Sequence, residues 1–447
     1  MALTGMAIYK NLPKTNCKDC GFPTCLAFAM QVAAKQKALT DCPHLSDDAK
    51  AEFSDASAPP MKLVRIGPEG DTAVTIGQET VMFRHEEKFH NAPALAAKIP
   101  ASLSDDDATA RMDRINQAVF TRIGQDIGVR LAAVEIEGLS AEAAATRVQA
   151  LAAKSRVPFV LVGSDAAVMA AAVAPIADKM PLIYQATEAN ADAMIQIAAD
   201  KKCPLAMAAD TLEKLADLVK AARDKGVADV VLSFDGKNTA SSIRQITAAR
   251  RAALKKNFRA LGFPAMVDVA CDDPFQETIL ATTFVSKYAG VLIVNGLDGS
   301  ELLPLLTAVQ NIYTDPQVPN TVEAKLYEIG DVNENSPVLF TTNFSLTYFS
   351  VEGEVERSKV PTYICVVDTE GLGVLNAYAG DKISAETVVK TLAEQNVADK
   401  VKHRKLIIPG LLPSFRAEIE DTSEWKEVLI GPEAATSIPR FLNENWN

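Results

Sequence analysis

Between about residues 93 and 313 the sequence alternates short apolar runs with longer, Ala-rich segments of helical spacing. Short apolar runs without polar alternation are typical of parallel strands that are buried on both faces. Eight such runs lie at 93–99, 129–138, 158–163, 181–187, 204–210, 229–234, 264–270 and 290–296, and helices are expected at 140–155, 165–179, 212–225, 240–261 and 301–313. Eight βα units favour a closed (β/α)8 barrel, with an open doubly wound sheet as the alternative.

Polar residues cluster where these predicted strands end. They are Glu135, Glu137, Asp165, Glu188, Asp210, Asp235, Asp268, Asp272, Asn295 and Asp298. Barrels build their binding sites at this end, but acids here also cap the helices that follow. Both interpretations stay open for each residue.

A second α/β pattern follows the barrel. Strands are expected in VLFTTNF, at 362–369, at 405–410 and at 426–431, with helices at 384–397 and 433–442. A stretch of this length is too short for another barrel and fits a flavodoxin/Rossmann-like domain with a parallel sheet. We expect the chain to divide into an N-terminal domain (1–57), a barrel domain that begins with a small hairpin (58–325) and a C-terminal α/β domain (326–447).

Four of the seven cysteines lie within the first 42 residues, as NCKDCGFPTC and then DC. Cys17, Cys20, Cys25 and Cys42 have the spacing C-x2-C-x4-C-x16-C. In a reducing compartment a tight group of cysteines more often holds a metal than forms disulfides. A single C-x2-C pair, an x4 step and a distant Cys-Pro favour a [4Fe-4S] cluster, with a four-cysteine zinc site as the alternative. His44 is a further candidate ligand in place of Cys42.

Composition excludes several classes of protein. Hydrophobic residues make up 48% and charged residues 23%, which is typical of a globular chain. The net charge of −12 argues against nucleic acid or an anionic membrane as partner. No leader or apolar run of membrane-spanning length is visible, so a cytoplasmic location is expected.

Three small-residue turns follow strands of the predicted C-terminal domain, at 369–374, 410–413 and 431–436. Ligands of open α/β folds bind at the carboxyl ends of parallel strands, where glycines let a ligand approach the backbone. Ordinary turn chemistry is the alternative for any one of them. Neither a G-x-G-x-x-G fingerprint nor a P-loop is present, so a dinucleotide or NTP is disfavoured.

Five segments spread over the chain form a recognisable set: NCKDCGFPTC, NFSLTYFSVEGE, DTEGLGVLNAYAGDK, IPGLLPSFRAEIE and IGPEAATSIPRF. With them, and taken end to end, the chain resembles the large (gamma) subunit of the corrinoid iron-sulfur protein of the anaerobic acetyl-CoA (Wood-Ljungdahl) pathway. The resemblance implies a methyltransferase component: a methyl carrier whose cobamide, as Co(I), takes a methyl group from methyltetrahydrofolate through a separate methyltransferase. The methyl group then passes to acetyl-CoA synthase/CO dehydrogenase. A small (beta) barrel subunit and a low-potential electron donor are the other implied partners.

The resemblance also implies site residues. Cys17, Cys20, Cys25 and Cys42 would ligate the [4Fe-4S] cluster, which would reduce inactive Co(II) to Co(I). The corrinoid would be lined by Thr342, Leu346, Gly371, Leu372, Gly373, Val374 and Ala435. Together with the strand ends and turns, the cofactor-binding candidates are Thr341, Thr342, Leu346, Thr369, Glu370, Gly371, Leu372, Gly373, Val374, Gly410, Leu411, Ala434 and Ala435.

The sequence lacks the D-x-H-x-x-G motif by which many corrinoid domains supply a histidine to cobalt. The four histidines are His44, His85, His90 and His403, and none lies in such a motif. We therefore expect cobalt without a protein histidine, its lower base displaced, and so easier to reduce. Two other functions stay open: an iron-sulfur flavoprotein that carries electrons, and a pterin-dependent methyltransferase in which the barrel does the chemistry.

Overall fold

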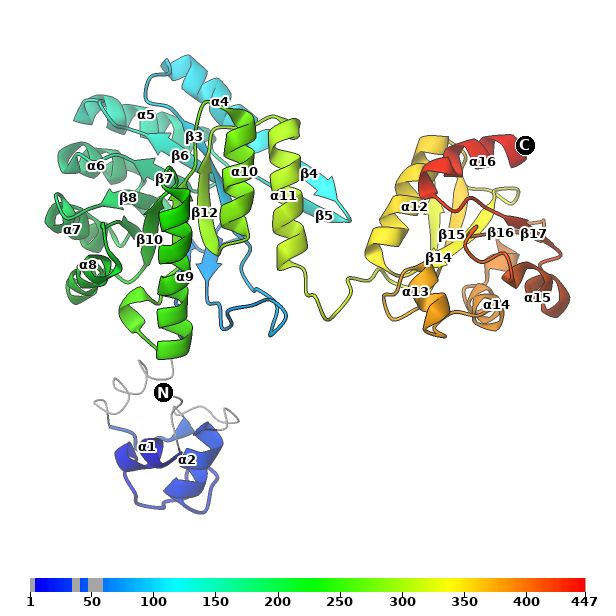
Figure 1. Ribbon diagram of the computed structural model, residues 1–447, viewed down its shortest axis with the longest axis horizontal. Helices are drawn as coiled ribbons and strands as arrows, with labels where there is room; N and C mark the ends of the chain where they lie inside the picture. Colours follow the sequence, from blue (N-terminus) through cyan, green and yellow to red (C-terminus); the bar gives the residue numbers. More distant parts are fainter. Residues whose placement is uncertain (1–4, 34–40, 47–58, 447) are drawn as a thin grey trace. The chain divides into compact units, whose positions relative to one another are not determined.

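The eight apolar runs predicted from the sequence form the strands of a closed parallel barrel (Figure 1). In the computed structural model, residues 5–33, 41–46 and 59–446 are described. The barrel strands are β3 (Ala94–Ile99), β6 (Leu131–Glu135), β7 (Phe159–Val162), β8 (Leu182–Ala186), β9 (Leu205–Met207), β10 (Val230–Asp235), β11 (Ala265–Asp268) and β12 (Ala289–Val294). Pairing of β12 with β3, the last strand with the first, closes the ring and excludes the open sheet.

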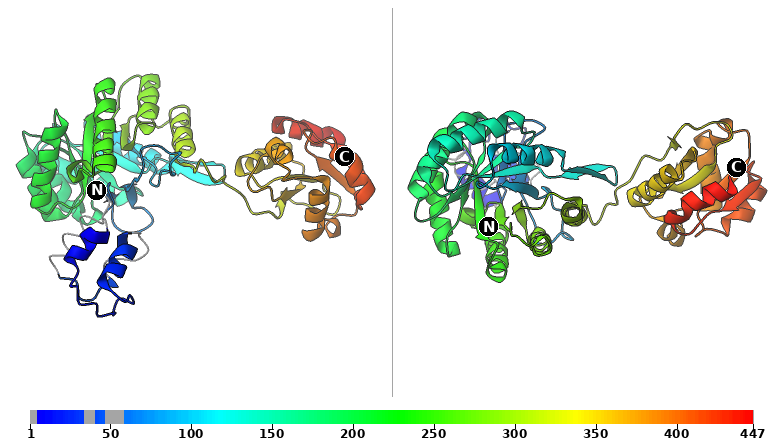
Figure 2. Two further views of the ribbon diagram at one scale, coloured as in Figure 1. Left: turned by 60° about the horizontal axis from the view of Figure 1, so that its bottom comes forward. Right: turned by 90° about the horizontal axis from the view of Figure 1, so that it is seen from above.

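One helix follows each barrel strand and lies on the outside of the ring (Figure 2). The five helices expected from the sequence are present, and α4, α7 and α10 complete the set. The helices are α4 (Asp105–Gln117), α5 (Ala141–Lys154), α6 (Ala166–Val173) with η2 (Ala174–Lys179), α7 (Ala191–Lys201), α8 (Leu212–Asp224), α9 (Thr239–Lys256) with η3 (Arg259–Leu261), α10 (Pro274–Val285) and α11 (Gly299–Tyr313).

The expected hairpin covers the amino end of the barrel. It consists of β1 (Leu63–Ile66) and β2 (Val74–Gly77), which pair antiparallel. Gly67 N donates to Met180 O, just before β8. Gly67 has a positive φ of 94°, and a Cβ there would lie 2.6 Å from the side chain of Pro158. The amino end is therefore filled by protein, and the opposite end of the barrel stays open.

The C-terminal sheet has five strands, one more than predicted. They are β13 (Leu326–Ile329), β14 (Val338–Thr342), β15 (Thr362–Val367), β16 (Lys405–Ile408) and β17 (Glu427–Ile430), in the order β13-β15-β14-β16-β17. The sheet is mixed rather than wholly parallel, because β13 joins the edge of β15 antiparallel. This short, partly exposed strand has no buried apolar run that would reveal it in the sequence.

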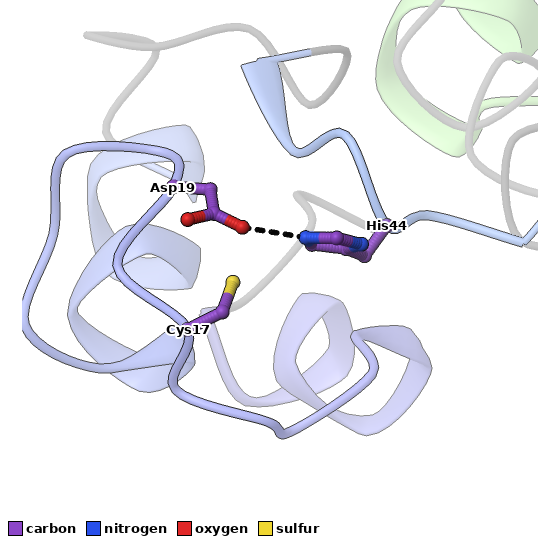
Figure 3. A group of neighbouring side chains, drawn as sticks. All are labelled: Cys17, Asp19 and His44. Carbon is purple, nitrogen blue, oxygen red and sulfur yellow. Dashed lines mark hydrogen bonds and ion pairs between the residues drawn. The ribbon is translucent and has the colours of Figure 1, made fainter.

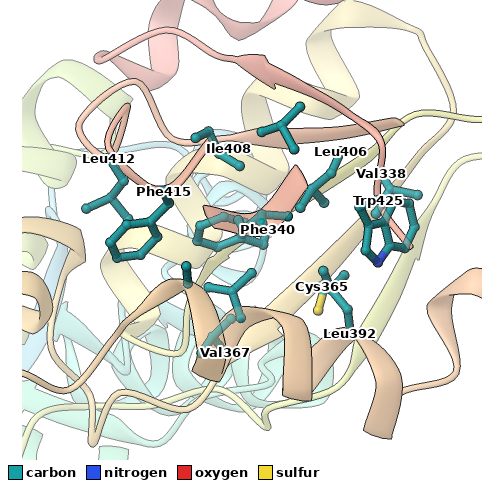
Figure 4. Packing of buried hydrophobic residues seen from close by; sticks show 14 of the residues in the cluster. Val338, Phe340, Cys365, Val367, Leu392, Leu406, Ile408, Leu412, Phe415 and Trp425 are labelled. Carbon is teal, nitrogen blue, oxygen red and sulfur yellow. The ribbon is translucent and has the colours of Figure 1, made fainter. Parts of the chain in front are cut away.

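Helices cover both faces of this sheet. They are α12 (Ser345–Ser358), α13 (Val374–Ala379), α14 (Ala385–Glu394), η4 (Val397–Asp399), α15 (Phe415–Thr422), η5 (Ala435–Ser437) and α16 (Ile438–Asn445). On β14, Phe340 packs into the core under α14 and α15 (Figure 4), and Leu339 packs into the core under α12 and α16. Because successive residues alternate between two buried faces, the strands read as continuous apolar runs. The predicted helix at 433–442 is η5 followed by α16.

The chain divides into two units by its contacts. The first comprises Met1–Val119 and Gly128–Tyr313, and the second comprises Phe120–Ile127 and Thr314–Asn447. The segment Phe120–Ile127 belongs to a hairpin of β4 (Val119–Arg122) and β5 (Gln125–Gly128) that the sequence did not reveal. The three-domain division at residues 57 and 325 stays a prediction, and residues 47–58, which include the first boundary, lie outside the described residues. Among the described residues, no helix combines the length and apolar character needed to cross a membrane.

Candidate functional site

The four N-terminal cysteines surround a small core of their own. Helix α1 (Gly5–Asn11) and helix α2 (Cys25–Ala33) supply its apolar residues, with Ile8 and Phe28 almost fully buried. Cys25 and Cys42 are buried in this core, Cys20 is half-buried and Cys17 is exposed. Burial raises the pKa of the Cys42 thiol, and the neighbouring thiols of Cys20, Cys17 and Cys25 raise it further. The structure therefore brings the four predicted ligands together.

The backbone before the first two cysteines has an unusual conformation. Lys14, Asn16 and Lys18 have positive φ angles of 58°, 49° and 69°, and the residues between them do not. Non-glycine residues rarely adopt this conformation. Alternating left- and right-handed residues point successive N–H groups to one side, which forms the concavity that binds anions and iron-sulfur clusters. Asn16 also anchors the loop, since its Oδ1 accepts from Cys25 N at 2.8 Å.

Asp19 and His44 join the two ends of the cysteine segment (Figure 3). His44 Nε2 lies 2.6 Å from Asp19 Oδ2, and this hydrogen bond lowers the pKa of Asp19. Among the described residues, the ligand atoms of Cys17, Asp19 and His44 form the one group of three or more that all lie within 4.8 Å of one another. Sulfurs around a tetrahedral zinc ion lie about 3.8 Å apart, as a Zn–S distance of ~2.3 Å requires. No three of the four cysteine sulfurs lie within 4.8 Å of one another, so they do not form the compact set that such an ion needs.

A cavity of about 490 Å³ opens in the C-terminal sheet domain. It lies at the carboxyl ends of β14 and β16, which are adjacent in the sheet but not in the sequence. The chain runs outward from this pair in opposite directions, to β15 on one side and to β17 on the other. Such a topological switch point is where open α/β sheets bind ligands. The walls are mainly apolar and come from β14, α12, α13, β16, the loop after β17 and α16.

Six of the thirteen predicted cofactor-binding residues line this cavity: Thr341, Leu346, Gly373, Val374, Leu411 and Ala435. The other seven lie outside its lining: Thr342, Thr369, Glu370, Gly371, Leu372, Gly410 and Ala434. The assignment of all thirteen to a cofactor stays a prediction. Lining residues that the sequence did not reveal include Thr347, Ser350 and Val351 on α12 and Ile438, Phe441 and Leu442 on α16. Helical spacing shows which residues share a face of α12 or α16, but not that this face meets the cavity.

Two glycines of the predicted set have structural tasks. A Cβ on Gly410 would lie 2.5 Å from Gly431 O, so Gly410 lets two strand-end loops pack on each other. Gly371 has a φ of 77°, and a Cβ there would lie 2.7 Å from the side chain of Pro319. Close approach of another backbone segment accounts for Gly410, and a positive φ with close approach of a neighbouring side chain accounts for Gly371.

Thr341 brings an unused hydroxyl to the cavity. Its side chain is 1% exposed and Thr342 is 0% exposed, and neither Oγ1 has a hydrogen-bond partner within the described part of the chain. A buried hydroxyl without a partner is costly, so such groups are usually bonded. Because Thr341 lines the cavity, a ligand there can supply the missing partner.

Asn343 holds the turn that follows β15. Its Oδ1 accepts from Thr369 N at 3.1 Å and from Gly371 N at 3.0 Å, while its amide donates to Asp368 Oδ1 at 2.8 Å. Asn343 is 5% exposed. The predicted turn at 369–374 is therefore fixed from the end of the neighbouring strand, by a residue that the sequence did not single out.

The residues that line the cavity include no histidine. His403, the histidine of this domain, is used elsewhere: its ring packs edge-on against Trp446, and Nε2 lies 2.9 Å from Ser336 O. Nδ1 accepts from Lys405 N at 3.2 Å, and burial lowers the pKa of His403.

Several strand-end acids of the barrel have local structural partners. Asp165 and Asp273 cap α6 and α10 by accepting from the first N–H groups of each helix. Glu135 pairs with Lys98 at 2.7 Å, and Glu137 accepts from Ser164 N at 2.7 Å. The capping interpretation is confirmed for Asp165. Asp273 was not among the predicted residues, and Glu135 and Glu137 have structural partners of other kinds.

Two family models match the chain. One, described as "CO dehydrogenase/acetyl-CoA synthase delta subunit", covers residues 63–442, and one described as "Putative Fe-S cluster" covers residues 12–44. The chain is similar to the "Corrinoid/iron-sulfur protein large subunit" of Moorella thermoacetica, with 42% identity over 445 residues that cover 100% of this chain and 99% of the relative. It is 35% identical, over 99% of both chains, to the "Acetyl-CoA decarbonylase/synthase complex subunit gamma" of Methanothermobacter thermautotrophicus. Among solved structures, the match to a dihydropteroate synthase of Xanthomonas albilineans covers 57% of this chain and 100% of that protein, at 16% identity and a TM-score of 0.41.

Replacing Asn343 tests its role in the turn. The Asn343→Ala change leaves the N–H groups of Thr369 and Gly371 without an acceptor, so we expect the free energy of unfolding of this domain to fall by about 2–4 kcal/mol. Both tryptophans of the chain, Trp425 and Trp446, lie in this domain, so tryptophan fluorescence in urea reports on it selectively. The exposed Asn445→Ala is the control. A loss in Asn343→Ala no larger than in the control contradicts the assigned role.

Proposed function

Because this chain belongs to the family of corrinoid/iron-sulfur protein large subunits, we propose that it is a methyl carrier of the acetyl-CoA pathway. In this proposal a cobamide binds to the C-terminal sheet domain and a [4Fe-4S] cluster binds to the N-terminal cysteines. The bound cobamide supplies a cobalt that, as Co(I), accepts the methyl group of methyltetrahydrofolate through a separate methyltransferase and passes it to acetyl-CoA synthase. The cofactor carries the chemistry, and the protein sets its binding, ligation and access.

The cavity at the β14–β16 boundary is the observation that carries the cobamide assignment. Its mainly apolar walls suit the aromatic base in the nucleotide tail of a cobamide. Thr341 offers a hydroxyl that has no hydrogen-bond partner among the described residues. Leu346 and Leu375, at 46% and 54% exposed, leave an apolar surface beside the opening. We assign the binding of the cobamide and its nucleotide tail to the residues that line this cavity, Thr341, Leu346 and Leu375 among them.

The lining without histidine supports the predicted ligation of cobalt. An imidazole or benzimidazole ligand stabilises the higher oxidation states of cobalt and makes reduction to Co(I) harder. Because His403 is held by Ser336 and Trp446, it is not available to cobalt. We therefore propose a base-off cobamide, whose reduction is within reach of a low-potential cluster.

The cysteine segment fits a cluster better than a single ion. Cys25 and Cys42 belong to one small core and Cys20 packs against it, while Cys17 lies near enough to affect the pKa of Cys42. No three of the four sulfurs lie within 4.8 Å of one another, and the backbone alternation at 14–18 forms an anion-binding concavity. We assign the four cysteines as ligands of a [4Fe-4S] cluster. When bound, the cluster would supply the electrons that return Co(II) to Co(I), taken from a low-potential donor.

Partners follow from the same assignment. The relative from Moorella thermoacetica is named a large subunit, and we propose that this chain likewise assembles with a small barrel subunit. The methyltransferase and acetyl-CoA synthase/CO dehydrogenase would then reach cobalt in turn.

Cofactor analysis tests the proposal as a whole. Protein purified without oxygen is expected to contain about one cobalt and about four irons per chain, from one cobamide and one four-iron cluster. Its absorption spectrum should be that of a base-off corrinoid. Flavin bands without cobalt would identify an electron-carrying flavoprotein instead, and demethylation of methyltetrahydrofolate by the chain alone would identify a methyltransferase barrel.

A cysteine variant separates the roles of the two cofactors. We expect Cys20→Ala to keep its cobalt and to transfer methyl groups when cobalt starts as Co(I), but to lose reactivation of Co(II) by a low-potential protein donor. Cys271→Ala, which changes a half-buried cysteine of the barrel, is the matched control. Reactivation of Cys20→Ala at the rate of the control contradicts the assignment of the cluster.

A further inference from the structure

A second cavity lies at the open carboxyl end of the barrel. Its volume is about 740 Å³, within the range of ligand pockets. We call it the barrel-mouth cavity; among its lining residues are Tyr184, Gln185, Asp210, Ser233, Phe234, Asp235 and Asp268. In barrels of this kind the carboxyl end carries the binding site, because eight strand-end loops converge there.

The barrel-mouth cavity is rich in hydrogen-bond acceptors. Asp268 is half-buried, and within the described residues it receives one hydrogen bond, from Ala270 N at 3.0 Å, which uses one of the roughly four acceptor positions of a carboxylate. Asp235, its register partner on β10, similarly accepts from Lys237 N. Gln185 Oε1 is buried and has no partner among the described residues. Burial raises the pKa of Asp268, so donors that reach its carboxylate would be stabilising.

The charge of the lining favours a ligand that donates hydrogen bonds over an anion. Two lysines line the cavity, and one of them, Lys98, is paired with Glu135 at 2.7 Å. Glu188 is likewise paired with Lys214 at 3.0 Å. What remains for a ligand is three carboxylates, those of Asp210, Asp235 and Asp268, against the one lysine Lys237, together with the unpartnered amide oxygen of Gln185.

A metal ion fits poorly as well. The one group of three potential ligands found within 4.8 Å among the described residues lies at the N-terminal cysteines, and the acids of the barrel mouth do not form such a group. Within the described part of the barrel, no set of three side-chain ligands is therefore in place for one ion. An organic ligand that carries several N–H donors can span these acids.

Aromatic surface favours a flat ligand. Tyr184 and Phe234, at 8% and 5% exposed, line the cavity beside Ala208, Ala209 and Ala270. Aromatic and alanine side chains form a flat apolar surface on which a planar ring can lie. A carboxylate such as that of Asp268 can accept two parallel N–H groups, as it does from an arginine side chain.

From these contacts we propose that the barrel-mouth cavity binds a planar 2-amino-4-oxopyrimidine-type heterocycle, whose two adjacent N–H groups bond to Asp268. Gln185 Oε1 is a further acceptor for the ligand. Pterins and guanine share this edge, so the ligand class is defined by the edge rather than by one compound. The site lies in the barrel unit and is independent of the cobamide cavity.

Fluorescence titration of the purified holoprotein with 6-methylpterin tests the proposal. Lumazine, which carries a carbonyl in place of the 2-amino group, is the matched ligand and should bind at least tenfold more weakly. Guanosine is added as a competitor because it carries the same hydrogen-bonding edge as a pterin. If guanosine displaces 6-methylpterin, the site recognises this edge alone. If guanosine binds and 6-methylpterin does not, the ligand is a purine. Equal binding of 6-methylpterin and lumazine overturns the proposal, as does the absence of binding by both 6-methylpterin and guanosine.

Variants locate the site. Asp268→Asn keeps the shape of the side chain but cannot accept two N–H groups, so we expect at least tenfold weaker binding of 6-methylpterin. Asp217→Asn, at an exposed site on α8, is the control and should bind as the unchanged protein does. Cobalt and iron content should be the same in both variants, which separates this site from the cobamide site. Unchanged affinity in a folded Asp268→Asn variant overturns the assignment, and the comparison with lumazine decides the question if that variant does not fold.

Discussion

The parallel pairing of β14 with β16 is the constraint on which the cofactor assignment depends. Leu339 and Ile407 are in register across this pair, and the chain leaves it toward opposite edges of the sheet. No crossover helix can cover the carboxyl ends at this point, so a cavity remains between α12, α13 and α16. Thr341, at the end of β14, is held there with an unpartnered hydroxyl because both faces of its strand are buried. Backbone topology therefore creates the site, and side chains set its chemistry.

The N-terminal and C-terminal sites are complementary in chemistry. The cysteine segment concentrates four thiols and a concavity of N–H groups, which suits an anionic cluster. The C-terminal cavity has apolar walls and no histidine in its lining, which suits a cobalt that must be reduced. The barrel contributes neither the thiols nor the apolar cavity. Its open end has the hydrogen-bond acceptors of the barrel-mouth cavity instead. The cysteine segment, the barrel and the C-terminal sheet domain thus each have a site of different chemistry.

Local sequence predicted the elements but only part of the contacts. The eight barrel strands were predictable because each is an apolar run buried on both sides. Strand β13 was not, because it lies at an edge of the sheet and none of its four residues is fully buried. The role of Gly410 depends on Gly431, which is remote in the sequence. The α12 and α16 walls of the cavity depend on how helices meet across the sheet, which no local pattern encodes. Asn343 is a further case, since its partners lie one strand away.

Blocking the C-terminal cavity tests the central claim most directly. Ala435 lines the cavity and Thr436 beside it is exposed outside the lining, so Ala435→Trp fills the space while Thr436→Trp adds the same ring at the surface. The measurement is the ratio of cobalt to iron in each protein after anaerobic purification. If the cavity holds the cobamide, cobalt falls at least tenfold in Ala435→Trp with iron unchanged, and Thr436→Trp keeps both. Full cobalt in a folded Ala435→Trp protein would contradict the account.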